Sequence, residues 1–116
     1  MRAIDRLYKR EETITRSVHI DEDLYEKVQY LSENVYEASA SKIINVCIEN
    51  ALLKNKGINF YKKPANTDSI YRSIVLRKSF YNELLKIKDK TGISFSRLIN
   101  GVIKEFLEDY KDEFNK

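Results

Sequence analysis

The sequence predicts an α+β fold in which two copies of one strand–helix–helix unit share a single core. The first observation is an internal repeat, because RSVHIDEDL, from Arg16 to Leu24, returns 56 residues later as RSIVLRKSF, from Arg72 to Phe80. The second is that a Ser-x-Ser motif opens a more apolar stretch in each copy, at Ser39 and again at Ser94. The third is size, since each copy spans only about 40 residues, too few to bury a stable core alone.

The composition limits the class of protein. The chain has 116 residues, of which 42% are hydrophobic and 34% are charged, so it is too apolar for a disordered protein and too charged for a membrane protein. The first 12 residues lack the apolar segment of a secretory signal, and we therefore expect a cytoplasmic location. The single cysteine, Cys47, cannot form an internal disulfide and is interpreted as a small core residue.

Charge is distributed unequally between the copies. Residues 13–57 carry 5 basic and 7 acidic side chains, whereas residues 70–116 carry 10 basic and 7 acidic side chains. The second copy is therefore the basic one, within a chain of net charge +3. An excess of positive charge favours a polyanionic partner, although a solvated surface alone also explains it.

Each copy begins with a short strand whose side chains alternate between two faces. We expect the core face to carry Ile14, Val18, Ile20, Ile70, Ile74 and Leu76. Arg16 and Arg72 interrupt this apolar row at the same place in both copies. A charge on the core side of a strand is unfavourable unless the side chain reaches water or a partner, so the recurrence predicts a specific exit route.

An amphipathic helix follows each strand. The first is predicted from Asp21, as N-cap, through Glu33, and the second from about Lys78 to Lys90, where Arg77 replaces the aspartate. Their core positions are Leu24, Val28 and Leu31 in the first and Phe80, Leu84 and Ile87 in the second. Gly92 is expected to end the latter helix in a left-handed conformation.

The second helix of each copy begins at Ser39 or Ser94 as N-cap and carries a wide apolar stripe. The stripes consist of Ile43, Ile44, Cys47, Ile48, Ala51 and Leu52 in the first copy, and Leu98, Ile99, Val102, Ile103, Phe106, Leu107 and Tyr110 in the second. We expect these two helices to form the shared core.

Four segments follow from this division of the chain. A basic N-terminal arm, residues 1–12, precedes the first repeat, residues 13–55; a linker, residues 56–68, joins it to the second repeat, residues 69–116. The arm is either a loosely ordered terminus or a contact to DNA phosphates.

The two strands are expected to pair with each other. A lone strand leaves its backbone donors and acceptors unpaired, and the only other predicted strand is its own repeat. Antiparallel pairing with Ser17 opposite Ser73 satisfies both strands and creates a pseudo-two-fold axis. The outward face of this ribbon would then carry Thr15, Ser17, His19, Tyr71, Ser73 and Val75.

The strands TRSVHI and YRSIVL, the polar or charged helix start after each, and the second-helix openings SASKIIN and SFSRLIN resemble the ribbon-helix-helix (MetJ/Arc) family of DNA-binding proteins. The resemblance covers about residues 13–55 and 69–110. In that family two chains usually pair their strands into a ribbon that enters the DNA major groove. This chain is similar to such a dimer fused into one polypeptide, as in the conjugation accessory protein TraY.

A two-stranded ribbon fits the major groove, where each base pair presents a distinct set of donors and acceptors. The predicted base contacts are Thr15, Ser17, His19, Tyr71, Ser73 and Val75. Serine and threonine discriminate bases weakly, so specificity would be modest or would depend on DNA shape. The alternative is that this polar face is simply solvated.

Helix N-termini bind phosphates, and the resemblance implies this role for the two second helices. The predicted phosphate contacts at these helix starts are Ser39, Ser41, Lys42, Ser94, Ser96 and Arg97. Further candidates for phosphate contact are Arg16, Arg72 and Arg77. Ser39 and Ser94 would also cap their helices. Because the halves differ in charge and in strand residues, an asymmetric DNA site is expected.

Other functions are less well supported by the residues. His19 is the only histidine, and the three glycines form no phosphate-binding loop, so we expect neither an enzyme nor a cofactor. The predicted partner is double-stranded DNA, with self-association along DNA left open. Within DNA binding, a transcriptional repressor and a TraY-like conjugation or partition role are both open. A further alternative is an antitoxin-like or scaffold module that binds a protein through its helices or its N-terminal arm.

Overall fold

The computed structural model describes residues 12–35, 38–54 and 68–111. Its elements, in chain order, are β1 (Thr13–Asp21), α2 (Glu22–Asn34), α3 (Ala40–Leu53), β2 (Ser69–Arg77), α4 (Lys78–Thr91) and α5 (Phe95–Asp109). This order confirms the predicted α+β fold, in which a strand–helix–helix unit occurs twice. Apart from Glu12 and Asp68, the predicted N-terminal arm and linker lie outside the described residues.

The two strands form an antiparallel ribbon in the predicted register. Ser17 is paired with Ser73, Thr15 with Val75 and His19 with Tyr71. Because residue 17 and its repeat equivalent 73 face each other, a pseudo-two-fold axis passes between them and relates the two copies. The strands end at Asp21 and Arg77, the residues predicted to precede the first helices, since Asp21 pairs with Ser69 and Arg77 pairs with Thr13.

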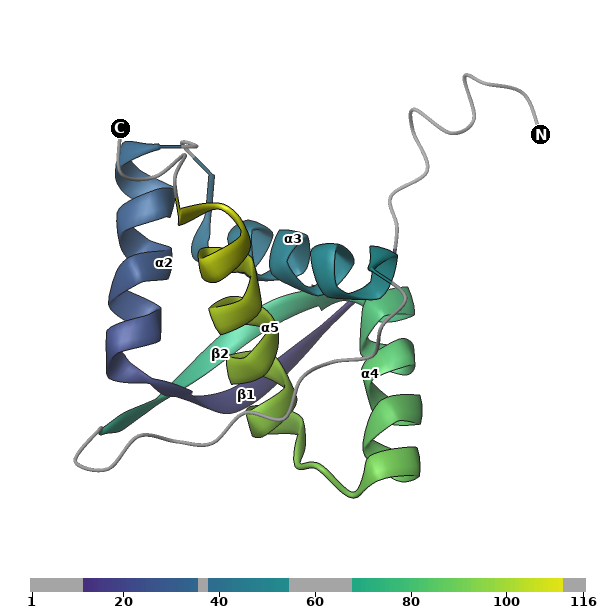
Figure 1. The fold of residues 1–116 in the computed structure, drawn as a ribbon. Helices are drawn as coiled ribbons and strands as arrows, with labels where there is room; N and C mark the ends of the chain where they lie inside the picture. The colour runs from purple at the N-terminus through teal and green to yellow at the C-terminus, as the bar shows by residue number, and fades with distance from the viewer. Residues whose placement is uncertain (1–11, 36–37, 55–67, 112–116) are drawn as a thin grey trace.

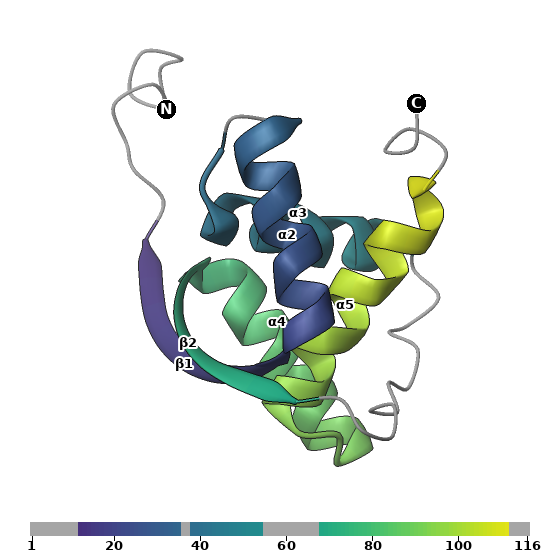
Figure 2. The same ribbon diagram turned by 90° about the vertical axis from the view of Figure 1, so that its left-hand side faces the viewer.

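The molecule has two layers, a curved ribbon and a layer of helices. Both strands curve around the helices, and no element among the described residues covers the outer side of the ribbon (Figure 2). Within the helical layer, α3 and α5 lie between α2 and α4 (Figure 1). No helix in the described part of the chain is long and apolar enough to cross a lipid bilayer.

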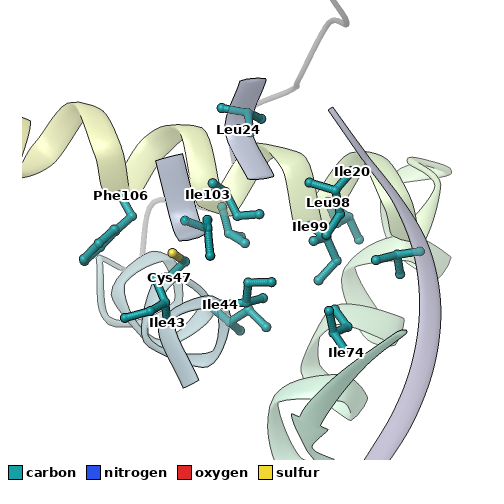
Figure 3. Close-up of a cluster of buried hydrophobic side chains, with 14 of the residues drawn as sticks. Ile20, Leu24, Ile43, Ile44, Cys47, Ile74, Leu98, Ile99, Ile103 and Phe106 are labelled. Atoms are coloured by element: carbon teal, nitrogen blue, oxygen red, sulfur yellow. The ribbon is translucent and has the colours of Figure 1, made fainter. Parts of the chain in front are cut away.

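Residues from both copies form one hydrophobic core. Ile20 and Ile74 project from the ribbon toward Ile44 of α3 and Ile99 of α5, as Figure 3 shows. All four side chains are almost completely buried. Cys47 is buried in the same cluster, which confirms its interpretation as a core residue. The core is shared as predicted, because neither copy contains enough of these residues to enclose them alone.

The two first helices are buried to different extents. In α2 the three predicted core residues are all buried, whereas in α4 only Leu84 is. Phe80 and Ile87, which share the predicted apolar face with Leu84, are half-buried and pack at the border of the core. Helix α4 also contacts α5 through Tyr81, whose ring packs edge-on against that of Phe95 with the ring centres 5.4 Å apart.

The first helices are also capped differently from the prediction. Asp21 occupies the N-cap position of α2, but its side chain accepts no hydrogen bond from the helix. The Glu22 N–H instead donates to the Asp68 carbonyl oxygen at 2.8 Å, and the equivalent Lys78 N–H donates to the Glu12 carbonyl oxygen at 2.9 Å. The ribbon thus continues its backbone pairing into both helix starts, so a side-chain cap is not needed there.

The caps predicted for the other helices are confirmed. Ser39 accepts a hydrogen bond from the Lys42 N–H, and Ser94 accepts one from the Arg97 N–H. Gly92 ends α4 with φ of 76°, a left-handed conformation that glycine adopts without steric strain. At the far ends of α3 and α5, Lys54 forms ion pairs with Glu105 and Asp109 and so joins the two central helices.

Candidate nucleic-acid interface

The outward face of the ribbon carries the six side chains predicted to contact bases. They are Thr15, Ser17, His19, Tyr71, Ser73 and Val75, and all six are exposed. Strand alternation produces this segregation, because the intervening residues Val18, Ile20, Ile74 and Leu76 are buried in the core. The structure therefore brings the six residues together on one surface that no described element covers, called here the ribbon face.

The ribbon face changes character along its length. At its centre, the Ser17 and Ser73 hydroxyl oxygens lie 3.2 Å apart and form a hydrogen bond. On one side of this pair, the rings of His19 and Tyr71 are in contact, with centroids 4.6 Å apart. On the other side, Thr15 is paired with Val75. One half of the face is thus aromatic and rich in hydrogen-bonding groups, and the other half is small and aliphatic.

The two arginines that interrupt the apolar rows leave the ribbon by equivalent routes. Arg16 of β1 places its guanidinium 5.0 Å from the ring centre of Tyr81 on α4, and its Nε donates to the Tyr81 hydroxyl at 3.1 Å. Arg72 of β2 lies 5.4 Å from the ring centre of Tyr25 on α2. Each arginine is therefore supported by a tyrosine of the other copy and stays exposed, which confirms the predicted exit route.

Ser41 and Ser96 have a structural role that their sequence positions did not reveal. The Ser41 hydroxyl accepts a hydrogen bond from the Val75 N–H at 3.0 Å, and the Ser96 hydroxyl accepts one from the His19 N–H at 3.2 Å. Each second helix therefore holds the outer edge of the other copy's strand. A serine hydroxyl that accepts still has a proton to donate, so both residues remain candidates for phosphate contact.

Asn45 and Asn100, for which no role was predicted, complete this attachment. Asn45 accepts from the Arg77 N–H at 3.0 Å and donates to the Val75 carbonyl at 2.9 Å. Asn100 accepts from the Asp21 N–H at 2.8 Å and donates to the His19 carbonyl at 3.0 Å. The available signal was an asparagine four residues after each serine, because asparagine is a poor residue for the interior of a helix unless its side chain is used.

The other predicted phosphate contacts flank the ribbon face. Ser39 and Ser94 cap α3 and α5, and Lys42 and Arg97 follow three residues later on the exposed side of each helix start. Arg77 lies at the end of β2, with its guanidinium 5.4 Å from the ring centre of Phe80. These residues are all exposed, so the ribbon face is bordered at both ends by cationic side chains and a helix N-terminus.

A groove of about 490 Å³ lies between α2 and the end of α5. Its lining mixes charged residues with Tyr30, Leu31 and Leu107.

No protein-family model, curated protein or solved structure matches this chain. The geometry of the ribbon face and its borders is therefore the basis on which a function is proposed.

Proposed function

We propose that this protein is a tandem ribbon-helix-helix protein that binds double-stranded DNA by inserting its ribbon into the major groove. The observation that carries the proposal is the ribbon face, on which six exposed side chains lie on the side that no described helix covers. The major groove, about 12 Å wide, admits a two-stranded ribbon and displays the edges of all four base pairs.

The chemistry of the ribbon face suits this role. Serine, threonine, histidine and tyrosine side chains offer hydrogen bonds to base edges, and Val75 offers an apolar contact to a thymine methyl group. The starts of α3 and α5, with Lys42 and Arg97, would contact phosphates on either side of the ribbon. Because the two halves of the face differ, the target would be an asymmetric site. The role that we favour is transcriptional regulation, with repression as its simplest form.

Salt-dependent binding of DNA tests the proposal. We would select duplexes from a random pool and measure their affinity by fluorescence anisotropy at several salt concentrations. A steep, linear fall of log K with log salt is expected, since cationic side chains release counterions from the phosphates. Because Ser41 and Ser96 also hold the strands, the informative variants are Lys42→Ala and Arg97→Ala, whose side chains are exposed.

The two variants should weaken binding to all duplexes alike and reduce the salt slope, with unchanged thermal stability. DNA binding that is absent at low salt, or that does not depend on salt, would contradict the proposal. Those outcomes would favour the alternative of a protein-interaction module, for which the groove between α2 and α5 is a candidate surface.

A further inference from the structure

The two ends of the ribbon carry opposite charge. The end at which β1 begins comprises residues 12–16, 74–79 and 39–42; its charged side chains are Glu12, Arg16, Lys42, Arg77 and Lys78. Four cations and one carboxylate give this basic end a net charge of +3. The pseudo-symmetric end comprises residues 68–72, 18–23 and 94–97; its charged side chains are Asp21, Glu22, Asp23, Asp68, Arg72 and Arg97. Four carboxylates and two cations give this acidic end a net charge of −2.

The whole difference arises at the two strand–helix junctions. Asp21, Glu22 and Asp23 occupy the junction of β1 with α2, whereas the residues at the same places between β2 and α4 are Arg77, Lys78 and Ser79. The other charged positions keep their sign across the pseudo-two-fold axis, since Arg16 corresponds to Arg72 and Lys42 to Arg97. The repeat is therefore symmetric in its backbone but polar in its electrostatic field.

From this charge distribution, and resting on the proposed DNA-binding function, we infer that the protein grips DNA unequally, with stronger phosphate contacts at the basic end than at the acidic end. Each junction lies four residues from the Ser17–Ser73 centre, or about 13 Å along the strand. A DNA duplex carries one negative charge per about 1.7 Å of its axis, so both ends of a bound ribbon meet phosphates. The acidic junction weakens the attraction at its own end, and this difference between the two ends fixes the direction of the protein on its site.

Except for Asp21, which is buried, the charged side chains at both junctions are available for such contacts. Glu22, Asp23 and Lys78 are exposed, and the ion pair of Lys78 with Glu12, at 3.1 Å, is itself on the surface. Surface ion pairs of this kind contribute little free energy, so Lys78 can exchange Glu12 for a phosphate. Glu22 and Asp23, in the first turn of α2, are negatively charged and so cannot bind a phosphate in this way.

Phosphate-ethylation interference on a selected duplex of about 30 base pairs tests the inference. For the unmodified protein we expect interfering phosphates to be concentrated in one half of the site. Glu22→Lys should add contacts in the other half, steepen the slope of log K against log salt by about 1 and raise affinity several-fold at low salt. Lys78→Glu should do the reverse, with a shallower slope and fewer interfering phosphates in the strong half.

Glu33→Lys is the matched control, because it makes the same charge change on α2 about 16 Å further along the helix. It should change neither the slope nor the interference pattern, and melting temperatures would show that all three variants fold. Equal interference in both halves for the unmodified protein, or an equal effect of Glu22→Lys and Glu33→Lys, would overturn the inference while leaving DNA binding intact. Failure to bind any duplex at low salt would overturn the proposed function as well.

Discussion

The Ser17 and Ser73 hydroxyl oxygens lie 3.2 Å apart, on the pseudo-two-fold axis that relates the two copies. In an antiparallel pair, side chains approach most closely at the positions where the backbone groups do not bond to each other. Residues two or four positions from Ser17 or Ser73 along the strands therefore also direct their backbone N–H groups away from the partner strand. Those N–H groups at His19 and Val75 are the ones held by Ser96 and Ser41.

Replacing an exposed aromatic residue of the ribbon face should weaken DNA binding without affecting the fold. Tyr71 is 63% exposed, and its ring lies against the His19 ring at a tilt of 48°, so Tyr71→Ala should leave the melting temperature nearly unchanged. A lost base contact is worth about 1–3 kcal/mol, so the affinity for a selected duplex should fall about tenfold or more. Tyr30→Ala, at a residue 55% exposed on α2, is the control and should retain full affinity.

The two asparagines should differ in their contribution to stability. Asn100 is only 5% exposed and bonds to the backbone of Asp21, which is 3% exposed, whereas Asn45 is half-buried and bonds to exposed residues. A buried polar group that is left without a hydrogen-bond partner reduces the stability of the protein by about 1–3 kcal/mol, whereas an exposed group forms a hydrogen bond with water instead. Asn100→Ala should therefore lower the free energy of unfolding, measured in urea, clearly more than Asn45→Ala does. Equal losses for the two variants would contradict this account of the ribbon edges.

Cys47 should be unreactive in the folded protein. Burial raises the pKa of its thiol to about 12, because the thiolate would lose its hydration in the core. The reactive species is the thiolate, so a thiol reagent at pH 8 should label the native protein far more slowly than the unfolded protein in urea. Native labelling at the rate of the unfolded chain would show that the core opens readily.

The Cys47 thiol also makes the stability of the protein depend on pH in the alkaline range. The folded state keeps the Cys47 proton up to about pH 12, whereas the unfolded chain releases it near its ordinary value of 9.0. The stability that this thiol contributes is therefore complete below pH 9 and decreases as the pH rises above it. Cys47→Ala removes the titration, so its stability relative to the unmodified protein should improve between pH 9 and 11.

The ion pairs at the ends of α3 and α5 should lose their effect in acid. Hydrogen bonds from Lys54, and then from Asn50, hold the pKa of Asp109 below its usual value of 3.8. A lowered pKa means that the contribution is present above about pH 4 and disappears as the pH falls through the lowered value. The difference in melting temperature between the unmodified protein and Lys54→Met should therefore shrink below pH 4. A difference that is constant from pH 7 to pH 3 would contradict this expectation.

Sequence reasoning predicted the elements well because the repeat supplied two independent copies of each pattern. The pairing of the strands followed from the requirement that each find a partner, and the register followed from placing the equivalent residues Ser17 and Ser73 on the pseudo-two-fold axis. The caps at Ser39 and Ser94 followed from local helix chemistry. The half-burial of Phe80 was not predictable from periodicity. Spacing identifies which face of a helix is apolar, but the depth to which that face is covered depends on the packing of its neighbours.

The cross-copy hydrogen bonds were equally hidden in the sequence. That Asn45 and Asn100 bond to a strand of the other copy depends on where two distant segments meet in space, and local propensity records only that asparagine is unusual within a helix. The pairing of Arg16 with Tyr81 was missed for the same reason, although the need for some exit route was visible.

Both strands of the ribbon belong to one polypeptide, and this determines how the protein behaves on dilution. A reading surface assembled from two separate chains is lost by mass action when those chains become scarce. A covalent connection replaces that encounter with an intramolecular one, at an effective concentration in the millimolar range for a short linker. Every copy of this protein therefore carries a complete ribbon, even if the cell makes only a few molecules of it.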